Sequence, residues 1–260
     1  MTAPFAILTR TNLLVLAMAV FLVMASVGCR RNSNRNVNVN GGLPSLPGES
    51  AADHTKREAQ ALVEQGKELY KNDEDERAAQ TFQQAIQLNP DLAEAHLRLG
   101  MAYAALDRKV EADDSYKKAI ELYKKQVQSD PKDAASFFNL GLAHSALHQD
   151  ESATQAFRQA TRLKPDDEEA FYQLGMAEMR LAHYPEAISA FQKALELDPN
   201  DYRATEELET AKEGAKRIRE GKKHNEEMLK KEQENANANG NMNSNSRPKP
   251  SPKIKTSKPW

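Results

Sequence analysis

The sequence is poor in the residues on which disulfide, redox and zinc chemistry depend. It has a single cysteine, Cys29, among 260 residues, so no disulfide can form within one chain. Aromatic residues make up only 6% of the chain. The net charge is −2 and the isoelectric point about 6.3, so no basic field of the whole chain indicates nucleic-acid binding.

Sequence signals of catalysis are also missing. No glycine-rich phosphate loop is present, and nothing in the sequence orients a Ser-His-Asp set. His144 and His148 are four residues apart, but no Glu follows His144, so the helical zinc motif of metalloproteases is absent. We therefore expect no enzyme activity, no cofactor and no metal, and we expect His144 to pack in the interior.

One long hydrophobic run occurs, at the N-terminus. Residues 13–28 read LLVLAMAVFLVMASVG and are followed by Cys29 and by two arginines. An apolar run that ends in a small residue, here Gly28, is typical of the core and cleavage site of a signal peptide. Two alternatives remain: an uncleaved anchor helix, at the short end of the length that spans a bilayer, and an ordinary cleaved signal.

The segment Ala25-Ser26-Val27-Gly28-Cys29 resembles a bacterial lipobox. The resemblance implies that residues 1–28 are a lipoprotein signal peptide, cleaved before Cys29, and that this cysteine carries acyl chains that hold the protein at a membrane. Arg30 follows the cysteine, as in lipoproteins that are sorted to the outer membrane. We expect a periplasm-facing outer-membrane lipoprotein, or an inner-membrane protein if the segment stays uncleaved.

Two polar tracts flank the middle of the chain. In both, Asn stands at every second position, first from residue 32 to 40 and again from residue 235. Such segments cannot bury a core, so we expect a disordered tether over 29–58 and a disordered tail over 235–260. The tail ends in a stretch with five basic and no acidic residues, which either keeps the protein soluble or attaches weakly to anionic lipid.

Between the tracts the sequence repeats itself. Four glycines lead the alignment, and Ala, an aromatic residue and Ala follow each glycine after 12, 16 and 19 residues. The glycines are Gly66, Gly100, Gly141 and Gly175; the aromatic residues are Phe82, Tyr116, Phe157 and Phe191. Prolines close three of the units, and the aspartates after the unit ends are candidate helix caps: Asp91, Asp133, Asp166 or Asp167, and Asp201.

These units resemble the tetratricopeptide repeat, a helix–turn–helix of 34 residues. The resemblance implies an all-α solenoid of four tetratricopeptide units over 59–200, with a concave face that binds protein partners. Residues 201–220 carry one apolar stripe and residues 221–234 are almost all charged, so we expect a capping helix with a charged extension over 201–234. The second unit reaches its closing residue, Pro131, seven residues late, so its second helix gains about two turns. The extra turns are either a neutral length variant or a protruding contact edge.

In the family, three residues of each first helix line the concave groove. Carried over to this sequence, the groove residues are Val63, Lys67, Tyr70, Leu97, Met101, Ala104, Phe138, Leu142, Ser145, Tyr172, Met176 and Met179. The set is apolar and rich in methionine, with Lys67 alone among apolar neighbours, which favours an adaptable surface for a helix or an extended segment.

Together these features predict a membrane-anchored, non-catalytic scaffold of the bacterial cell envelope. It would bind an apolar or amphipathic segment of a protein partner, in pilus, secretion or outer-membrane assembly. The alternative is a structural lipoprotein that assembles with itself through the same groove, which the chain's own helix or a second copy would then cover.

Overall fold

The computed structural model of the chain describes Leu43 and residues 46–245, with side chains to residue 236. The expectations for the signal peptide, for Cys29 and the first part of the tether, and for the basic tail lie outside these residues. Leu46 and the residues after it belong to one structural unit, to which everything below refers.

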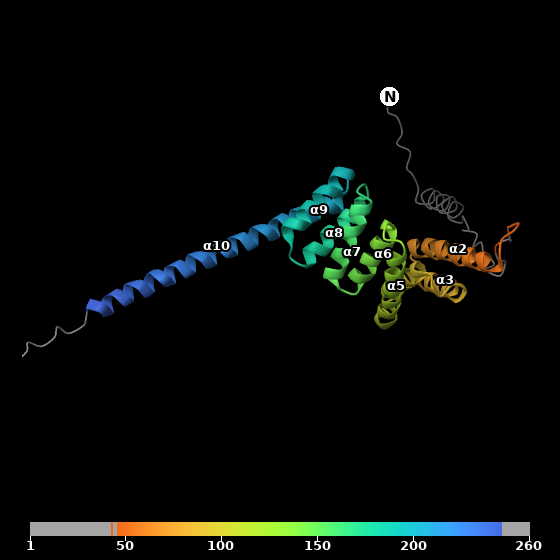
Figure 1. Cartoon of the computed structure of the whole chain (residues 1–260), viewed down its shortest axis with the longest axis horizontal. Helices are drawn as coiled ribbons and strands as arrows, with labels where there is room; N and C mark the ends of the chain where they lie inside the picture. Colours follow the sequence, from red (N-terminus) through yellow and green to blue (C-terminus); the bar gives the residue numbers. More distant parts are fainter. Residues whose placement is uncertain (1–42, 44–45, 246–260) are drawn as a thin grey trace, which may run out of the picture. The chain divides into compact units, whose positions relative to one another are not determined.

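Helices make up all regular secondary structure of residues 46–245 (Figure 1). Four helical hairpins follow one another and a single long helix ends the series, as expected. The helices are α2 (Ala51–Lys71), α3 (Asp75–Leu88), α4 (Ala93–Ala105), α5 (Lys109–Ser129), α6 (Ala134–Ala146), α7 (Asp150–Leu163), α8 (Glu168–Arg180), α9 (Tyr184–Leu197) and α10 (Tyr202–Asn245).

The hairpins stack so that each helix packs on its neighbours in sequence. The first helices of successive units, α2, α4, α6 and α8, also contact one another, and α10 continues this row. The second helices, α3, α5, α7 and α9, make no such contacts among themselves in residues 46–245. The first helices are therefore the closely spaced inner layer of a curved solenoid, and the second helices form its more open outer layer.

Close approach of the two helices of each hairpin depends on a glycine that faces an aromatic ring. A Cβ atom on Gly141 would lie 2.5 Å from Cε1 of Phe157, and Gly66, Gly100 and Gly175 have the same relation to their partner rings. The ring of Phe157 is completely buried. The periodic glycines and aromatic residues are thus two halves of one contact, which explains their fixed spacing in the sequence.

Each turn within a hairpin holds one residue in the left-handed backbone region: Asp73, Asp107, His148 or Ala182, with φ between 55° and 58°. The residue four positions before it is the partly buried Leu69 in the first unit, and in the other three units it is a buried polar residue. It contacts the residue just before the second helix: Arg108 stacks on Tyr103, Gln149 pairs with His144, and His183 pairs with Glu178. In these three units the contact joins the end of the first helix to the start of the second across the turn.

Aspartates cap the first helices of the third and fourth units as expected. Asp133 accepts a hydrogen bond from Ser136 N at 3.1 Å, and Asp167 accepts one from Ala170 N at 3.2 Å. The expected cap at Asp91 is wrong, because α4 starts three residues after the closing proline, as the other helices do, and this places Leu92 at the N-cap.

The helical region is longer than expected at both ends. α2 begins at Ala51, not at residue 59, because Ser50 accepts a hydrogen bond from Asp53 N at 3.1 Å and caps the helix there. α10 runs to Asn245, through the first part of the segment 235–260 in which we expected disorder. A helix that is already nucleated can add Asn residues at a cost of only tenths of a kcal/mol each.

The long second helix of unit two has the expected extra turns: α5 has 21 residues, whereas α3, α7 and α9 have 14 each. The added part of α5 packs against α6. Tyr123 is buried, and Gln126 Oε1 accepts a hydrogen bond from Ser136 Oγ of α6 at 3.0 Å.

The glycine–aromatic contact gives a test of the fold. Gly141→Ala places a methyl group against the buried Phe157 ring, and overpacking of this kind costs about 1–3 kcal/mol. Since alanine regains up to about 1 kcal/mol of helix propensity, we expect a net loss of about 1–2 kcal/mol in the free energy of unfolding by urea. Gly221→Ala is the matched control: no atom lies within 4 Å of its new Cβ, so stability should stay equal or rise. Equal effects of both changes would contradict the contact.

The junction of α8 with α10 gives a second test, in pH. Burial, together with the neighbouring carboxylates of Asp201 and Glu169, raises the pKa of Glu168 to about 7. The folded state therefore holds a proton that the unfolded chain releases above its ordinary pKa of about 4.5. This contribution to stability is complete below pH 4.5 and is lost as the pH rises towards 7. We expect Glu168→Gln to remove this part of the pH dependence and to raise the urea midpoint at pH 8. An unchanged pH profile would refute this assignment.

Candidate functional site

The inner layer carries all the predicted groove residues, but two of them do not reach the surface. Val63 is 2% exposed and Leu97 is fully buried, and both belong to the main hydrophobic cluster, which runs through the first two units into the third. They hold the first helices together and are not available to a partner.

At the other end of the inner layer the chain covers its own groove. Tyr172, Met176 and Met179 of α8 share one hydrophobic cluster with Leu208 and Ala211 of α10. The guanidinium of Arg203 of α10 also lies over the Tyr172 ring, 4.5 Å from its centroid. α10 therefore occupies the part of the groove that the fourth unit was expected to offer.

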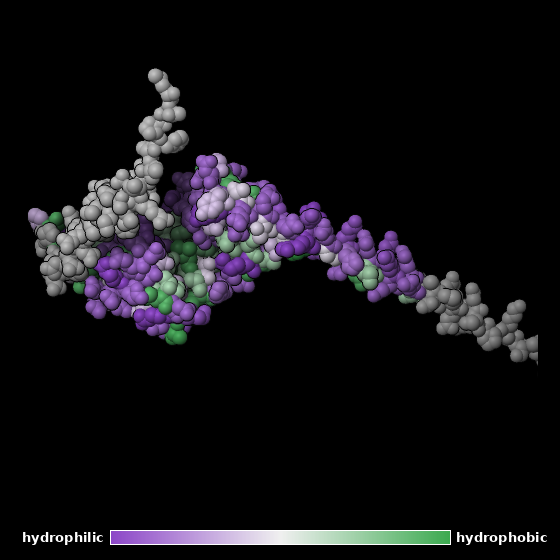
Figure 2. All heavy atoms as spheres, turned by 180° about the vertical axis from the view of Figure 1, so that it is seen from behind, coloured by the Kyte–Doolittle hydropathy of each residue, from purple (hydrophilic) through white to green (hydrophobic). Residues whose placement is uncertain are grey.

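Between these ends a shorter stretch stays open. It comprises Tyr70 of α2, Met101 of α4, and Phe138 and Leu142 of α6. Tyr70 is 37% exposed, and the other three are partly buried. Phe138 is held in place by the buried Phe157, since the two ring centroids are 5.8 Å apart. Figure 2 shows hydrophobic side chains in a hollow on one face of the repeat region, bordered by hydrophilic ones.

A line of charges crosses the first half of this open stretch. Lys67 Nζ lies 2.9 Å from Glu64 and 3.3 Å from Glu94 of the next unit, and Glu94 Oε1 lies 3.6 Å from Arg98 Nε. The hydrogen bond with Glu64 is the main cause that raises the pKa of Lys67. The interpretation of Lys67 as a lone charge among apolar residues is therefore wrong.

Arg98 connects this charged line to the apolar stretch. Its Nη1 donates to the sulfur of Met101 at 3.8 Å, and 29% of its side chain is exposed. Glu94 and Arg98 are four residues apart, so they share one helix face, and this spacing could have indicated them in the sequence.

A second charged group borders the stretch at α6. Arg180 of α8 donates to Asp150 Oδ1 at 2.5 Å and to Ser145 Oγ at 2.6 Å. Ser145 was expected on the groove, and here it is engaged by a neighbouring unit. Nothing in the sequence pattern indicated Arg180, because its partner Asp150 belongs to another unit.

The buried polar residues serve packing. His144 Nδ1 lies 2.6 Å from Gln149 Oε1, and burial lowers the pKa of the imidazole. Glu178 is 1% exposed and pairs with Arg158 at 2.5 Å and with His183 at 3.0 Å. The side chains described here include no group of three or more His, Cys, Asp or Glu residues that could hold a metal ion. None of the helices described has both the length and the hydropathy needed to cross a bilayer.

Family models match most of the solenoid. One described as "TPR repeat" matches residues 66–107, and two described as "Tetratricopeptide repeat" match residues 91–166 and 168–201. No curated protein matches the chain in sequence.

Several solved structures are similar to the chain. A crystal structure of MamA is 24% identical, with 69% of this chain and 94% of that chain covered and a TM-score of 0.45. PilF of Pseudomonas aeruginosa is 22% identical, with 62% and 69% covered and a TM-score of 0.49. The first TPR of Spaghetti (RPAP3), solved with an HSP90 peptide, is 25% identical, with 47% and 92% covered and a TM-score of 0.40.

Such similarity is too low to carry functions from those proteins to this one, so the assignment depends on the family models and on the packing of the hairpins. Tetratricopeptide domains in general are non-catalytic scaffolds for protein–protein interaction. The repeat region of this chain belongs to the tetratricopeptide-repeat family and forms an all-helical solenoid that ends in α10.

Proposed function

We propose that the protein is a non-catalytic scaffold that binds an apolar or amphipathic segment of another protein in the open stretch of the inner layer. The observation that carries the proposal is the set of partly exposed apolar side chains from Tyr70 to Leu142, supported from below by buried rings. An adaptable methionine, Met101, lies in the middle of this set and suits a surface that accepts segments of different shape.

The charges that border the open stretch favour a bound segment with polar residues at its ends. The Lys67–Glu94–Arg98 line lies on the α2–α4 side, and Arg180 lies on the α6–α8 side. A segment with apolar residues in its middle and polar residues at its ends fits this arrangement, because its ends meet charges while its middle is desolvated.

We further propose that the scaffold is attached to a bacterial envelope membrane through lipid on Cys29, in the outer membrane facing the periplasm. Support comes from the apolar run 13–28, the small residue before the cysteine and Arg30 after it. The alternative is an inner-membrane location with an uncleaved N-terminal anchor. Pilus, secretion and outer-membrane assembly are the processes that such a scaffold would serve.

The second candidate is a structural lipoprotein that uses the groove to assemble with itself. The observation in its favour is that the chain already covers one end of the groove with its own helix, α10. Under this alternative the open stretch binds another copy and no foreign segment.

Photo-cross-linking in living cells tests the groove. A photoreactive residue at position 101 or 142 should form adducts with the same segment of one partner protein, identified by mass spectrometry. Met101→Glu with Leu142→Glu should remove at least about nine-tenths of the captured partner, because two charges then replace desolvated apolar contacts. Circular dichroism should show unchanged helicity.

Val110 supplies the matched control, since it is an apolar residue of α5 that is 72% exposed. Val110→Glu should leave capture intact, and a photoreactive residue there should not label the partner. Adducts that contain only the protein itself would favour the self-assembling alternative, and capture that survives the double change would refute the assigned face.

The anchor is tested by the intact mass of the protein from its native membranes. We expect a chain that begins at Cys29 and carries a diacylglycerol and an acyl chain, and we expect Cys29→Ser to be neither processed nor lipidated. A mass that retains residues 1–28 would contradict lipidation and would leave a scaffold tethered by its N-terminal helix.

A further inference from the structure

The outer layer of the solenoid holds a pocket that is separate from the groove of the inner layer. It lies in the furrow between α5 and α7, two helices that make no contact with each other in residues 46–245. The floor of the furrow is α6, on which Phe137, Leu140 and His144 lie on one face and line the pocket. The volume of this α5–α7 pocket is about 500 Å³, which is enough for a large side chain.

The walls of the α5–α7 pocket are basic. Lys124 lies on the α5 wall, Arg158 and Arg162 lie on the α7 wall, and no acidic residue lines the pocket within the described part of the chain. Arg158 is paired with Glu178, which lies outside this lining. Lys124 and Arg162 are exposed and form no ion pair within residues 46–236, so two cationic groups remain for an anionic ligand.

The next unit has an equivalent pocket of the same volume, between α7 and α9, but the balance of its charges is opposite. Its floor repeats the α6 floor one unit later, with Phe171, Leu174 and Glu178 of α8. Three acidic and two basic residues line it, against three basic residues in the α5–α7 pocket. The furrow is therefore a general feature of adjacent units, whereas the positive charge is particular to the α5–α7 pocket.

The added turns of α5 bring Lys124 to this pocket. Aligned on the aromatic residues of the repeat, the residue of the next unit that corresponds to Lys124 is Pro165, which lies beyond the end of α7. A second helix of ordinary length thus has no such side chain here. Burial is the main cause that lowers the pKa of His144, and the charge of Lys124 lowers it further, so this ammonium group acts on the floor of the pocket. Figure 1 shows the end of α5 projecting beyond α6 and α7.

The flanking segments of the chain do not have the charge that this pocket needs in a ligand. Residues 1–48 and residues 246–260 contain basic residues and no Asp or Glu. A flat membrane surface does not reach the buried Leu140 and His144 at the floor of a furrow. An extended acidic segment fits, because it can insert one apolar side chain on the floor and place carboxylates on both walls.

We propose that the α5–α7 pocket binds an acidic segment of a second protein. The segment packs one apolar side chain on Phe137, and the acidic residues beside it meet Lys124 on one wall and Arg162 on the other. The added turns of α5 are then a contact edge and not a neutral length variant. Since the open stretch belongs to the inner layer and this pocket to the outer one, the scaffold can hold two segments at the same time.

Fluorescence anisotropy of a labelled probe peptide, titrated with the purified full-length protein, tests the proposal. The peptide carries one phenylalanine between two pairs of glutamates. Lys124→Glu with Arg162→Glu should weaken its binding at least about tenfold, because two attractive contacts become repulsive. Both residues are exposed, so folding is not at risk. Glycine in place of the phenylalanine of the peptide should weaken binding about fivefold or more, because the contact with the floor is lost.

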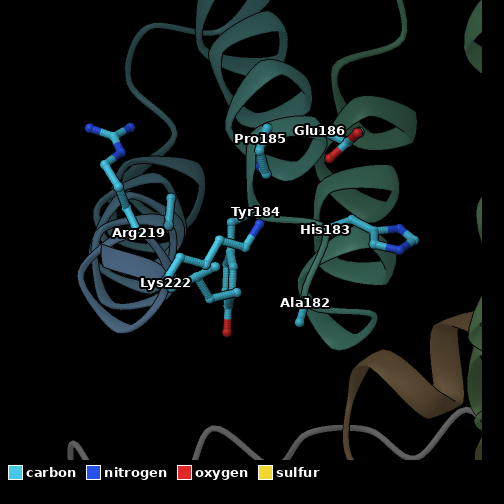
Figure 3. A pocket seen from close by; sticks show the side chains of 9 residues that line it. Ala182, His183, Tyr184, Pro185, Glu186, Arg219 and Lys222 are labelled. Carbon is cyan, nitrogen blue, oxygen red and sulfur yellow. The ribbon is translucent and has the colours of Figure 1, made fainter. Parts of the chain in front are cut away.

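Charge reversal at a different pocket is the matched control. A pocket of about 390 Å³ lies between α10 and the start of α9, and two basic residues of α10, Arg219 and Lys222, line it together with Glu186. Figure 3 shows Lys222 alongside Tyr184 and Arg219 extending from α10. Arg219→Glu with Lys222→Glu changes the net charge of the protein by the same amount and should leave the affinity for the peptide unchanged.

The floor provides a second matched pair. Phe137→Ala should weaken binding of the peptide about fivefold, because it removes the ring on which the phenylalanine of the peptide packs. Phe171→Ala makes the same change in the equivalent pocket between α7 and α9 and should leave binding unchanged. Both residues are partly buried, so a general loss of stability would affect the two variants alike.

Three results would overturn the proposal: no binding of the probe peptide, equal weakening in the α10 control, or equal weakening by Phe137→Ala and Phe171→Ala. Two other occupants would replace it. They are indicated if Lys124→Glu with Arg162→Glu leaves peptide binding unchanged and abolishes either binding to vesicles rich in phosphatidylglycerol or self-association measured by light scattering.

The pocket and the groove fail separately. Met101→Glu with Leu142→Glu should abolish partner capture in the groove and leave the affinity for the probe peptide unchanged. Lys124→Glu with Arg162→Glu should weaken peptide binding and leave cross-linking from position 101 unchanged.

Discussion

The structure depends on one repeated contact, an aromatic ring packed on a glycine. In each hairpin the missing side chain on the first helix, as at Gly141, makes room for a ring on the second, as at Phe157, and so fixes how closely the two helices approach. That distance sets the separation of the layers. Once it is fixed, the first helices can touch their counterparts in the next unit while the second helices stay apart, and the stack must curve.

Curvature alone does not decide how much of the inner layer is open to a protein partner. α10 ends the stack by packing where a further first helix would lie, and in doing so it covers the inner residues of the fourth unit. The same helix then continues beyond the hairpins with an exposed surface that is mostly charged. One element thus ends the core and shortens the groove.

Much of the fold could be predicted from the sequence, because the contacts within a hairpin are local and recur at fixed spacing. The extra turns of α5 are predictable for the same reason. The burial of Val63 and Leu97 is not, since it depends on how close the first helices of neighbouring units lie. Nor could the repeat pattern reveal the Arg180–Asp150 pair, which joins different units. The start of α2 was missed although its cap, Ser50 with Asp53, is local.

The insertion in α5 also has a consequence for helical phase. Seven added residues turn a helix through about 700°, within about 20° of two complete revolutions, so residues beyond the insertion face almost the same direction as before. Tyr123, in the added part of the helix, follows the buried Tyr116 by seven residues, so the same rotation turns it to the buried side as well. An insertion of five residues would rotate the following chain by more than a third of a revolution and break the stacking of unit three. Length variation in this array is therefore restricted to steps that preserve phase.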